Sequence, residues 1–330
     1  MDGGSKRDTS REAATLSPIA VAWLGRIAYR DAWALQRRLV DARVAGDAPD
    51  HLLLLEHDAV LTLGRQADES HVLAAPRELR KRGIEVLRVE RGGEVTYHGP
   101  GQLVAYPILR LGDRGILIRP LVRALEEAMI ETCAALGVEA TRRDGHPGCW
   151  VVDGAANRPP RKIGALGIRV ERGVSYHGIA LNIAPDLRDF ELIDACGMPG
   201  VISTSIAEEV GRSAEPPSTE VVRRAGTVFA AAFGRAMSAD LEWVARPSGE
   251  READSSADLE WVAGPSPDLE WVAGPVGESR PAGEGALGDG ALGDGALGAG
   301  GTRTRAVHGR ASGPGGEDPD TPERMPAGVA

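Results

Sequence analysis

Lysine is rare in this chain, and one lysine stands where it could do chemistry. Of the 38 Lys and Arg residues, only Lys6, Lys81 and Lys162 are lysines. Lys162 opens the apolar run 163–168, whereas the other two lie in polar surroundings. Lysine, unlike arginine, can give up or share a proton. Lys162 is therefore either a proton-handling group or a strand-end side chain that extends to water.

Cysteine is the second candidate for chemistry. Cys133 falls within a helical pattern and Cys149 precedes Trp150 in an apolar run, so we expect both to be packed. Cys196 lies in Cys-Gly-Met-Pro-Gly, a loop of small residues where its side chain can be reached. A cation beside a thiol favours the nucleophilic thiolate, and Lys162 could supply that charge. For a lone cysteine, an inert buried thiol is the commoner alternative.

A glycine-rich stretch covers residues 91–102 and reads Arg-Gly-Gly-Glu-Val-Thr-Tyr-His-Gly-Pro-Gly-Gln. It separates two apolar runs, 84–89 and 103–111, which we expect to be strands. Glycine lets backbone approach a ligand closely and permits positive φ. A tight turn needs about two to five residues, so a loop of this length indicates a ligand-binding wall. It matches neither of the common glycine-rich nucleotide motifs.

Two histidines share a local context. Tyr97-His98-Gly99 and Tyr176-His177-Gly178 both stand where a strand meets a loop, so they could face one pocket. A zinc site is the alternative, but it needs three or four ligands at a recognisable spacing, and the sequence shows no such pattern. Hydrogen-bonding roles are therefore favoured.

The elements that must position these residues mix both periodicities. We expect helices over 29–44, 76–82, 117–136, 206–210 and 219–236, and a helical turn over 187–193. We expect strands over 19–24, 51–56, 59–64, 84–89, 103–111, 138–141, 149–152, 162–170 and 174–183, where 51–56 and 59–64 are either two strands or one bent strand. The link 171–173 is a hairpin signal. This pattern predicts an α+β fold with a mixed β-sheet packed on helices.

Charge and repeats divide the chain. The net charge is −10, but residues 246–330 hold 15 acidic and 7 basic side chains, so the acidity belongs mainly to this tail. The tail is rich in Gly and Pro and repeats Asp-Leu-Glu-Trp-Val-Ala, first seen at 240–245, at 258–263 and 268–273. We expect the first copy to close the core as a last strand. The prediction is a disordered N-terminus at 1–17, one domain at 18–245 and a disordered low-complexity tail at 246–330; an interaction tail is the alternative.

Composition also narrows the classes of partner. A near-neutral folded part argues against nucleic-acid binding, which needs a basic face. No apolar run approaches the ~18 residues of a membrane span, and the polar N-terminus lacks a signal-peptide pattern. An odd count of three cysteines at irregular spacing fits free thiols in a reducing compartment. We therefore expect a cytoplasmic protein.

Together these pieces resemble the lipoyl(octanoyl) transferases over roughly residues 20–240. The family pattern R-G-G-x-x-T-x-H-G-P-G-Q stands unbroken at 91–102, K-I-x-[AS]-[IL]-G at 162–167, H-G-[FI]-A-L-N at 177–182 and C-G-[ILM] at 196–198. Gly164 occupies a position where alanine is more usual. Four motifs in the right order make the resemblance specific.

The resemblance implies a fold shared with biotin and lipoate protein ligases. It also implies an enzyme that moves an octanoyl group from acyl carrier protein, through a cysteine thioester, to a lysine of lipoyl domains in 2-oxoacid dehydrogenase complexes and the glycine cleavage H protein. No cofactor is implied. The acyl-carrying cysteine falls on Cys196 and its activating lysine on Lys162. The substrate-binding positions fall on Arg91, Gly92, Gly93, Glu94, Val95, Thr96, Tyr97, His98, Ala165, Leu166, Gly167, Gly178, Ile179 and Ala180.

Two other functions compete with this interpretation. An ATP-dependent lipoate or biotin ligase on the same fold would need a nucleotide-phosphate site and no acyl-carrying cysteine, and the placement of Cys196 argues against it. A non-catalytic protein that binds acyl groups or lipoyl domains would lose Lys162 or Cys196, and both are present.

Overall fold

Two β-sheets of unequal size form the framework of the protein. The computed structural model describes residues 16–153, 158–211 and 218–247. The larger sheet contains, in spatial order, β12 (Leu241–Trp243), β1 (Ile19–Ile27), β2 (His51–His57), β6 (Gln102–Ile108), β10 (Val174–Asn182), β9 (Arg161–Glu171), β8 (His146–Val151) and β7 (Thr141–Arg143), with β11 (Ile202–Ser203) beside β9. The predicted segments 1–17 and 246–330 lie almost wholly outside the described residues.

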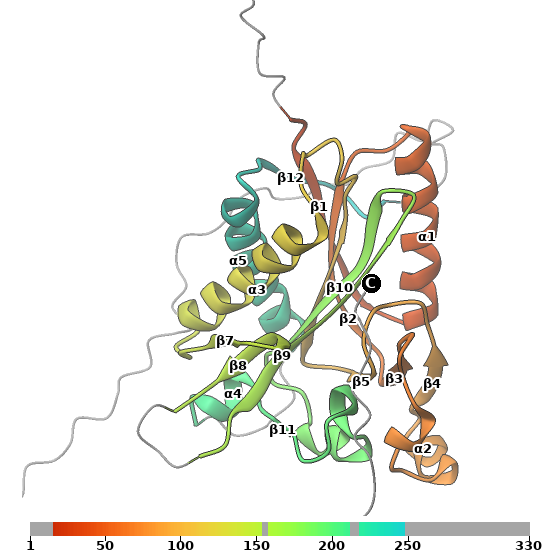
Figure 1. The fold of residues 1–330 in the computed structure, drawn as a ribbon, viewed down its shortest axis with the longest axis vertical. Coiled ribbons are helices and arrows are strands. Elements are labelled where there is room, and N and C mark those ends of the chain that lie inside the picture. The colour runs from red at the N-terminus through yellow and green to blue at the C-terminus, as the bar shows by residue number, and fades with distance from the viewer. Residues whose placement is uncertain (1–15, 154–157, 212–217, 248–330) are drawn as a thin grey trace, which may run out of the picture. The chain divides into compact units, whose positions relative to one another are not determined.

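Helices cover both faces of the larger sheet (Figure 1). Helices α3 (Ile118–Ala135) and α5 (Thr219–Met237) pack on one face, and α1 (Tyr29–Ala45) packs on the other. Both faces of strand β2 are covered. Leu52 and Leu54 pack on the side of α3 and α5, while Leu53 and Leu55 pack on the side of α1. Because both faces are buried, β2 is a continuous apolar run rather than an alternating one.

The smaller sheet supports one side of the site. It has the order β4 (Glu85–Arg88), β3 (Val60–Leu63), β5 (Val95–His98), and the short helix α2 (Pro76–Lys81) lies beside it. Its own core includes Leu61, Leu63, Val95 and Tyr97. The short helices η1 (Glu69–His71), η2 (Leu187–Leu192), η3 (Ala195–Gly197) and α4 (Ile206–Glu209) complete the described elements.

The structure confirms the predicted α+β class and corrects it in places. The hairpin between β9 and β10 forms as predicted, with Arg172 and Gly173 at positive φ. The first copy of the repeat supplies β12, which pairs in parallel with β1. The stretch 91–102 is not one loop, because Val95–His98 forms β5 against β3. The strands expected at 138–141 and 149–152 instead form at 141–143 and 146–151.

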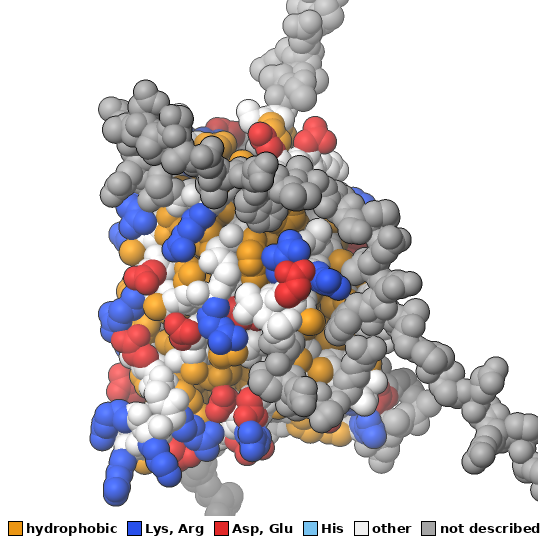
Figure 2. Space-filling model, turned by 180° about the vertical axis from the view of Figure 1, so that it is seen from behind, with side chains coloured by type: hydrophobic (Ala, Val, Ile, Leu, Met, Phe, Trp, Pro, Cys, Tyr) orange, Lys and Arg blue, Asp and Glu red, His pale blue; other side chains and the backbone are white. Residues whose placement is uncertain are grey.

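The surface is mixed in charge. Seen from behind, acidic and basic side chains are interspersed across the face (Figure 2). Ion pairs among the described residues include Arg88 with Glu69 and Arg235 with Glu131. Over the described ranges, no helix is both long and apolar enough to span a bilayer.

Candidate active site

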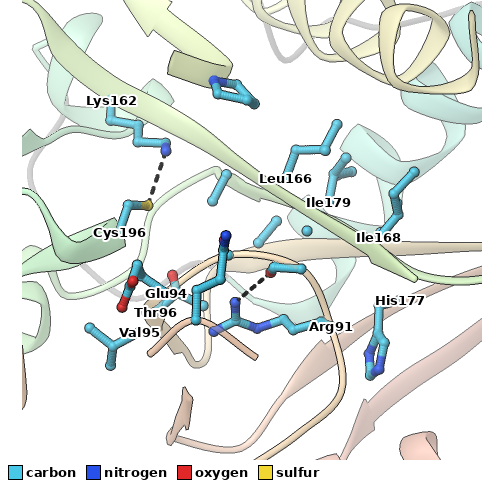
Figure 3. Close-up of a pocket in the computed structure, with 18 of the residues that line it drawn as sticks. Arg91, Glu94, Val95, Thr96, Lys162, Leu166, Ile168, His177, Ile179 and Cys196 are labelled. Atoms are coloured by element: carbon cyan, nitrogen blue, oxygen red, sulfur yellow. Dashed lines mark hydrogen bonds between the residues drawn. The ribbon is translucent and has the colours of Figure 1, made fainter. Parts of the chain in front are cut away.

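Lys162 and Cys196 meet although 34 positions separate them in the sequence (Figure 3). The Nζ atom of Lys162 lies 3.0 Å from Cys196 Sγ. Lys162 comes from β9 and is 8 % exposed, while Cys196 belongs to the η3 turn and is half-buried. The two atoms lie within hydrogen-bonding distance, so the fold places an amino group directly beside a thiol.

Three neighbours hold Lys162 in place. Its carbonyl accepts a hydrogen bond from Thr204 N at 2.9 Å. Its Nζ lies 5.2 Å from the ring centroid of Trp150, within cation–π range. A Cβ at Gly148 would lie 3.2 Å from Lys162 Cε, so glycine there leaves room for the lysine stem. Among the described ion pairs, none includes Lys162, which leaves Cys196 as its polar partner.

Cys196 sits on a strained backbone. Its φ is +59°, a left-handed conformation that non-glycine residues rarely adopt. Gly197 follows at φ +63°, and a Cβ there would lie 2.7 Å from Glu94 Cγ and 3.2 Å from His71 Cε1. The carbonyl of His71 also accepts from Asp194 N at 2.8 Å. The turn that carries Cys196 is therefore held tightly against η1 and the glycine-rich stretch.

The other two cysteines are packed, as expected. Cys133 and Cys149 are fully buried and their sulfur atoms lie 4.0 Å apart. Burial and the neighbouring sulfur raise the pKa of Cys133 well above its ordinary value, with the Cys149 hydrogen bond as the largest cause. Of the three thiols, Cys196 is thus the one that lines a cavity.

The glycine motifs interlock backbone to backbone. Gly92 N donates to the carbonyl of Ile168 at 3.2 Å. A Cβ at Gly167 would lie 2.7 Å from the carbonyl oxygen of Gly92. A Cβ at Gly64 would overlap the carbonyl oxygen of Gly93. These positions require glycine because another chain segment occupies the space of a side chain.

Arg91 is buried without a carboxylate. It is 7 % exposed and donates to Thr62 O at 2.6 Å, Thr62 Oγ1 at 2.9 Å and Gly92 O at 3.0 Å. No ion pair among the described residues includes it. Burial lowers the pKa of Arg91, whereas electrostatic interactions with Tyr29 and Cys196 raise it. Arg91 thus contributes a fixed positive charge to the cavity wall.

A polar chain fixes the protonation of His98. Asn182 Nδ2 donates to Thr204 O at 2.8 Å, and Gln102 Nε2 donates to Asn182 Oδ1 at 2.9 Å. Gln102 Oε1 must then accept from His98 Nδ1, at 2.7 Å. Burial holds the pKa of His98 well below its ordinary value, and the neighbouring His57 and Arg91 lower it further. His98 is therefore neutral, with its proton on Nδ1 and a free lone pair on Nε2.

One cavity of about 410 Å³ joins these groups. Of the substrate-binding positions expected from the sequence, the cavity is lined by Arg91, Gly92, Gly93, Glu94, Val95, Thr96, His98, Ala165, Leu166, Gly167, Gly178, Ile179 and Ala180, together with Lys162 and Cys196. Tyr97 is the exception. Its ring packs against Phe190 and its hydroxyl donates to Asp189 at 2.8 Å, outside the cavity.

Several lining residues did not emerge from the sequence as site residues. Tyr29 begins α1 and Tyr106 lies within β6, where neither has a distinguishing pattern. His177 also lines the cavity, so it does share a pocket with His98 as the two Tyr-His-Gly tripeptides suggested. The repeated Tyr-His-Gly tripeptide was the sequence signal for His177.

The chain matches a known family of catalytic domains. The model of the lipoyl protein ligase A/B catalytic domain matches residues 28–229. Lipoate-protein ligase A bound with ATP shares the fold, with a TM-score of 0.53 and 17 % identity over 71 % of this chain and 91 % of that one. The likeness to this solved structure establishes the fold, including the predicted likeness to lipoate protein ligases.

Curated sequences narrow the class further. An octanoyltransferase of Chloroflexus aggregans is 47 % identical over 207 residues, which are 62 % of this chain and 90 % of the relative. An octanoyltransferase of Acidobacterium capsulatum is 46 % identical over 218 residues, 64 % of this chain and 88 % of the relative. The chain belongs to the octanoyltransferases, a family of acyltransferases within the lipoyl protein ligase A/B class.

Proposed function

We propose that this enzyme transfers an octanoyl group from octanoyl-acyl carrier protein to a lysine of lipoyl domains, with Cys196 as the acyl carrier. The observation that carries the proposal is the 3.0 Å contact between Lys162 Nζ and Cys196 Sγ. Family membership supports octanoyl transfer, and the contact supplies a nucleophile beside a cation. Residues 18–245 form the catalytic domain in this proposal.

The first half-reaction loads Cys196. Its thiolate attacks the thioester carbonyl of the donor, so a new C–S bond forms and the old one breaks. The carrier protein leaves as a thiolate and takes a proton from the Lys162 ammonium. The enzyme is left as an octanoyl thioester with a neutral Lys162. Exchange of one thioester for another costs little free energy, so no nucleotide is required.

The second half-reaction unloads it. The neutral amine of the acceptor lysine attacks the thioester carbonyl, forming the C–N bond as the C–S bond breaks. Its surplus proton passes to Lys162, and Cys196 leaves as a thiolate beside the restored ammonium. Lipoyl domains of 2-oxoacid dehydrogenase complexes and the glycine cleavage H protein are the proposed acceptors.

The cavity suits the acyl chain. Leu166, Ile168 and Ile179 form an apolar wall that leads away from Cys196 (Figure 3). Burial of six methylenes is worth about 5 kcal/mol at ~0.8 kcal/mol each. The substrate-binding role of the glycine-rich stretch follows from its place along the same cavity.

Mass spectrometry tests the proposal directly. Purified enzyme with octanoyl-carrier protein and no nucleotide should gain one octanoyl mass, removable by hydroxylamine. Cys196→Ala should gain none, whereas Cys133→Ala should be loaded normally. Adding a lipoyl domain should then discharge the enzyme. Transfer that occurs only with ATP would overturn the proposal and indicate a ligase.

A further inference from the structure

The far end of the cavity differs from its apolar wall. Lys162 and Cys196 lie at one end and His177 at the other, with Leu166 and Ile179 between them (Figure 3). Tyr29 lines the same cavity and comes within 3.5 Å of His177 Nδ1 through its hydroxyl. An acyl chain that leaves Cys196 along the apolar wall therefore approaches polar atoms.

His177 has an unused polar atom. The side chain is 1 % exposed, and its Nε2 has no hydrogen-bond partner within the part of the chain that the structure describes. Buried polar atoms are normally paired, because an unpaired one loses the hydrogen bond it would make to water. His177 is one of the residues that line the cavity, so a ligand hydroxyl at this end could supply the partner that its Nε2 lacks.

The backbone keeps His177 in a costly conformation. Its φ is +55°, in the left-handed region, and its N–H donates to the buried Gln36 Oε1 at 2.7 Å. Such strain persists only where surrounding structure fixes it, and it is concentrated at functional sites. The conformation thus supports a specific task for this side chain.

The end of the cavity is neutral. Burial lowers the pKa of His177 to about 3, and the charge of Arg91 adds to this effect, while Glu90 opposes it. Burial raises the pKa of Tyr29 to about 12. Near neutral pH the imidazole and the phenol are both uncharged, and each can donate or accept. A hydroxyl, which also does both, matches them better than an anion.

We propose that His177 and Tyr29 form a hydroxyl-binding subsite, so that the enzyme also transfers medium-length acyl chains that carry a hydroxyl at their distal end. The inference rests on the proposed acyl transfer from Cys196 and adds a substrate class to it. In a wholly apolar pocket, a buried unpaired hydroxyl would lower the rate by about 10- to 100-fold.

Two carrier-bound thioesters of equal heavy-atom count test the subsite. In 8-hydroxyoctanoyl the hydroxyl takes the place of the last methyl of nonanoyl. Wild-type enzyme should use the two within about threefold of each other in kcat/KM, whereas His177→Phe should prefer nonanoyl by about tenfold or more. Tyr29→Phe should shift the ratio in the same direction. His51→Asn, a buried histidine outside the cavity, should leave it unchanged.

The ratio of the two kcat/KM values is measured on one preparation of each protein. It can therefore be determined even for a variant that folds incompletely. Normal octanoyl transfer with tenfold discrimination against 8-hydroxyoctanoyl by the wild type would overturn the subsite alone. An identical ratio in wild type, His177→Phe and Tyr29→Phe would do the same. Failure of octanoyl transfer itself would overturn the proposed function, and the subsite with it.

Discussion

The Nζ atom of Lys162 lies over the indole ring of Trp150, 5.2 Å from the ring centroid, and 3.0 Å from Cys196 Sγ. Trp150 is fully buried and its Nε1 donates to His146 O at 3.0 Å. The amino group of Lys162 thus contacts both an aromatic face and a sulfur atom. A cation–π contact of this kind is worth about 0.5–2 kcal/mol.

The aromatic face of Trp150, rather than its volume alone, should therefore support octanoyl transfer. Trp150→Phe keeps an aromatic face and should retain octanoyl transfer within about fivefold, whereas Trp150→Leu should lower kcat by tenfold or more. Steady-state transfer rates check this, with circular dichroism as the folding control. Equal rates for the two variants would show that Trp150 only fills space.

Substitution of Gly197 should impair the enzyme for two reasons, its positive φ and its close contact with the side chain of Glu94. Gly197 and Gly115 have φ of +63° and +62°, but a Cβ at Gly115 meets nothing within 4 Å. Both alanine variants should lose about 1 kcal/mol of stability. Only Gly197→Ala, pressed against Glu94, should also lose at least tenfold in rate of Cys196 loading. Similar loading by the two variants would contradict this.

Stability should fall in mild acid. Burial lowers the pKa of His57 to about 4 and of His177 to about 3, and it holds that of His98 well below its ordinary value. The unfolded chain binds these protons near pH 6.5, so the unfolded state gains protons first as pH falls. Stability is full above pH 6.5 and declines below it, by up to about 1.4 kcal/mol per pH unit for each histidine.

Urea unfolding from pH 7.5 to 5 measures this decline. His57→Gln removes one of the three groups, so its unfolding free energy should change less steeply with pH than that of the wild type. A free energy of unfolding that stays constant over this range would exclude the mechanism.

Because β12 is the last described strand, truncation on either side of it should affect stability differently. Removal of 248–330 should leave activity within about twofold and the melting temperature nearly unchanged, because β12 still pairs with Ile19–Val21. Truncation after Ser238 removes that strand and should lower the melting temperature by several degrees, since about 1 kcal/mol corresponds to ~2–4 °C in a domain of this size. Differential scanning calorimetry compares them. A large loss on the first truncation would show that the tail contributes to the folded domain.

Sequence patterns predicted those elements whose signals are local. The helical spacing that runs from Ile118 to Leu136 predicts α3, and its members Leu125, Met129, Thr132 and Leu136 are buried. Ile118, at the start of the helix, is instead 49 % exposed. Strands β5 and β11 escaped prediction, because glycines flank the first and the second has two residues whose partner is the backbone of β9. Their existence depends on neighbours that a local pattern does not contain.

The site divides in the same way. Lys162 and Cys196 stood out by rarity and by loop composition, and the motifs indicated most of the cavity wall. Tyr29 could not be identified, because its role comes from the crossing of α1 over β10. Tyr97 was expected along the cavity with its neighbours, but its ring and hydroxyl contact Phe190 and Asp189, which lie about 90 positions further along the chain. A local pattern does not contain such contacts.

The glycines of the site differ in how evolution could replace them. At Gly64, Gly167 and Gly178, the obstructing atoms are carbonyl oxygens of other segments, so no change of a partner's side chain makes room. At Gly197 the obstruction is the side chain of Glu94, which a smaller residue would relieve. The first three are therefore fixed requirements of this architecture. At Gly197 a smaller residue at position 94 would remove the closest contact, while the contact with His71 and the cost of a positive φ would stay. Correlated substitution should therefore be found between positions 94 and 197 and be absent at Gly64, Gly167 and Gly178.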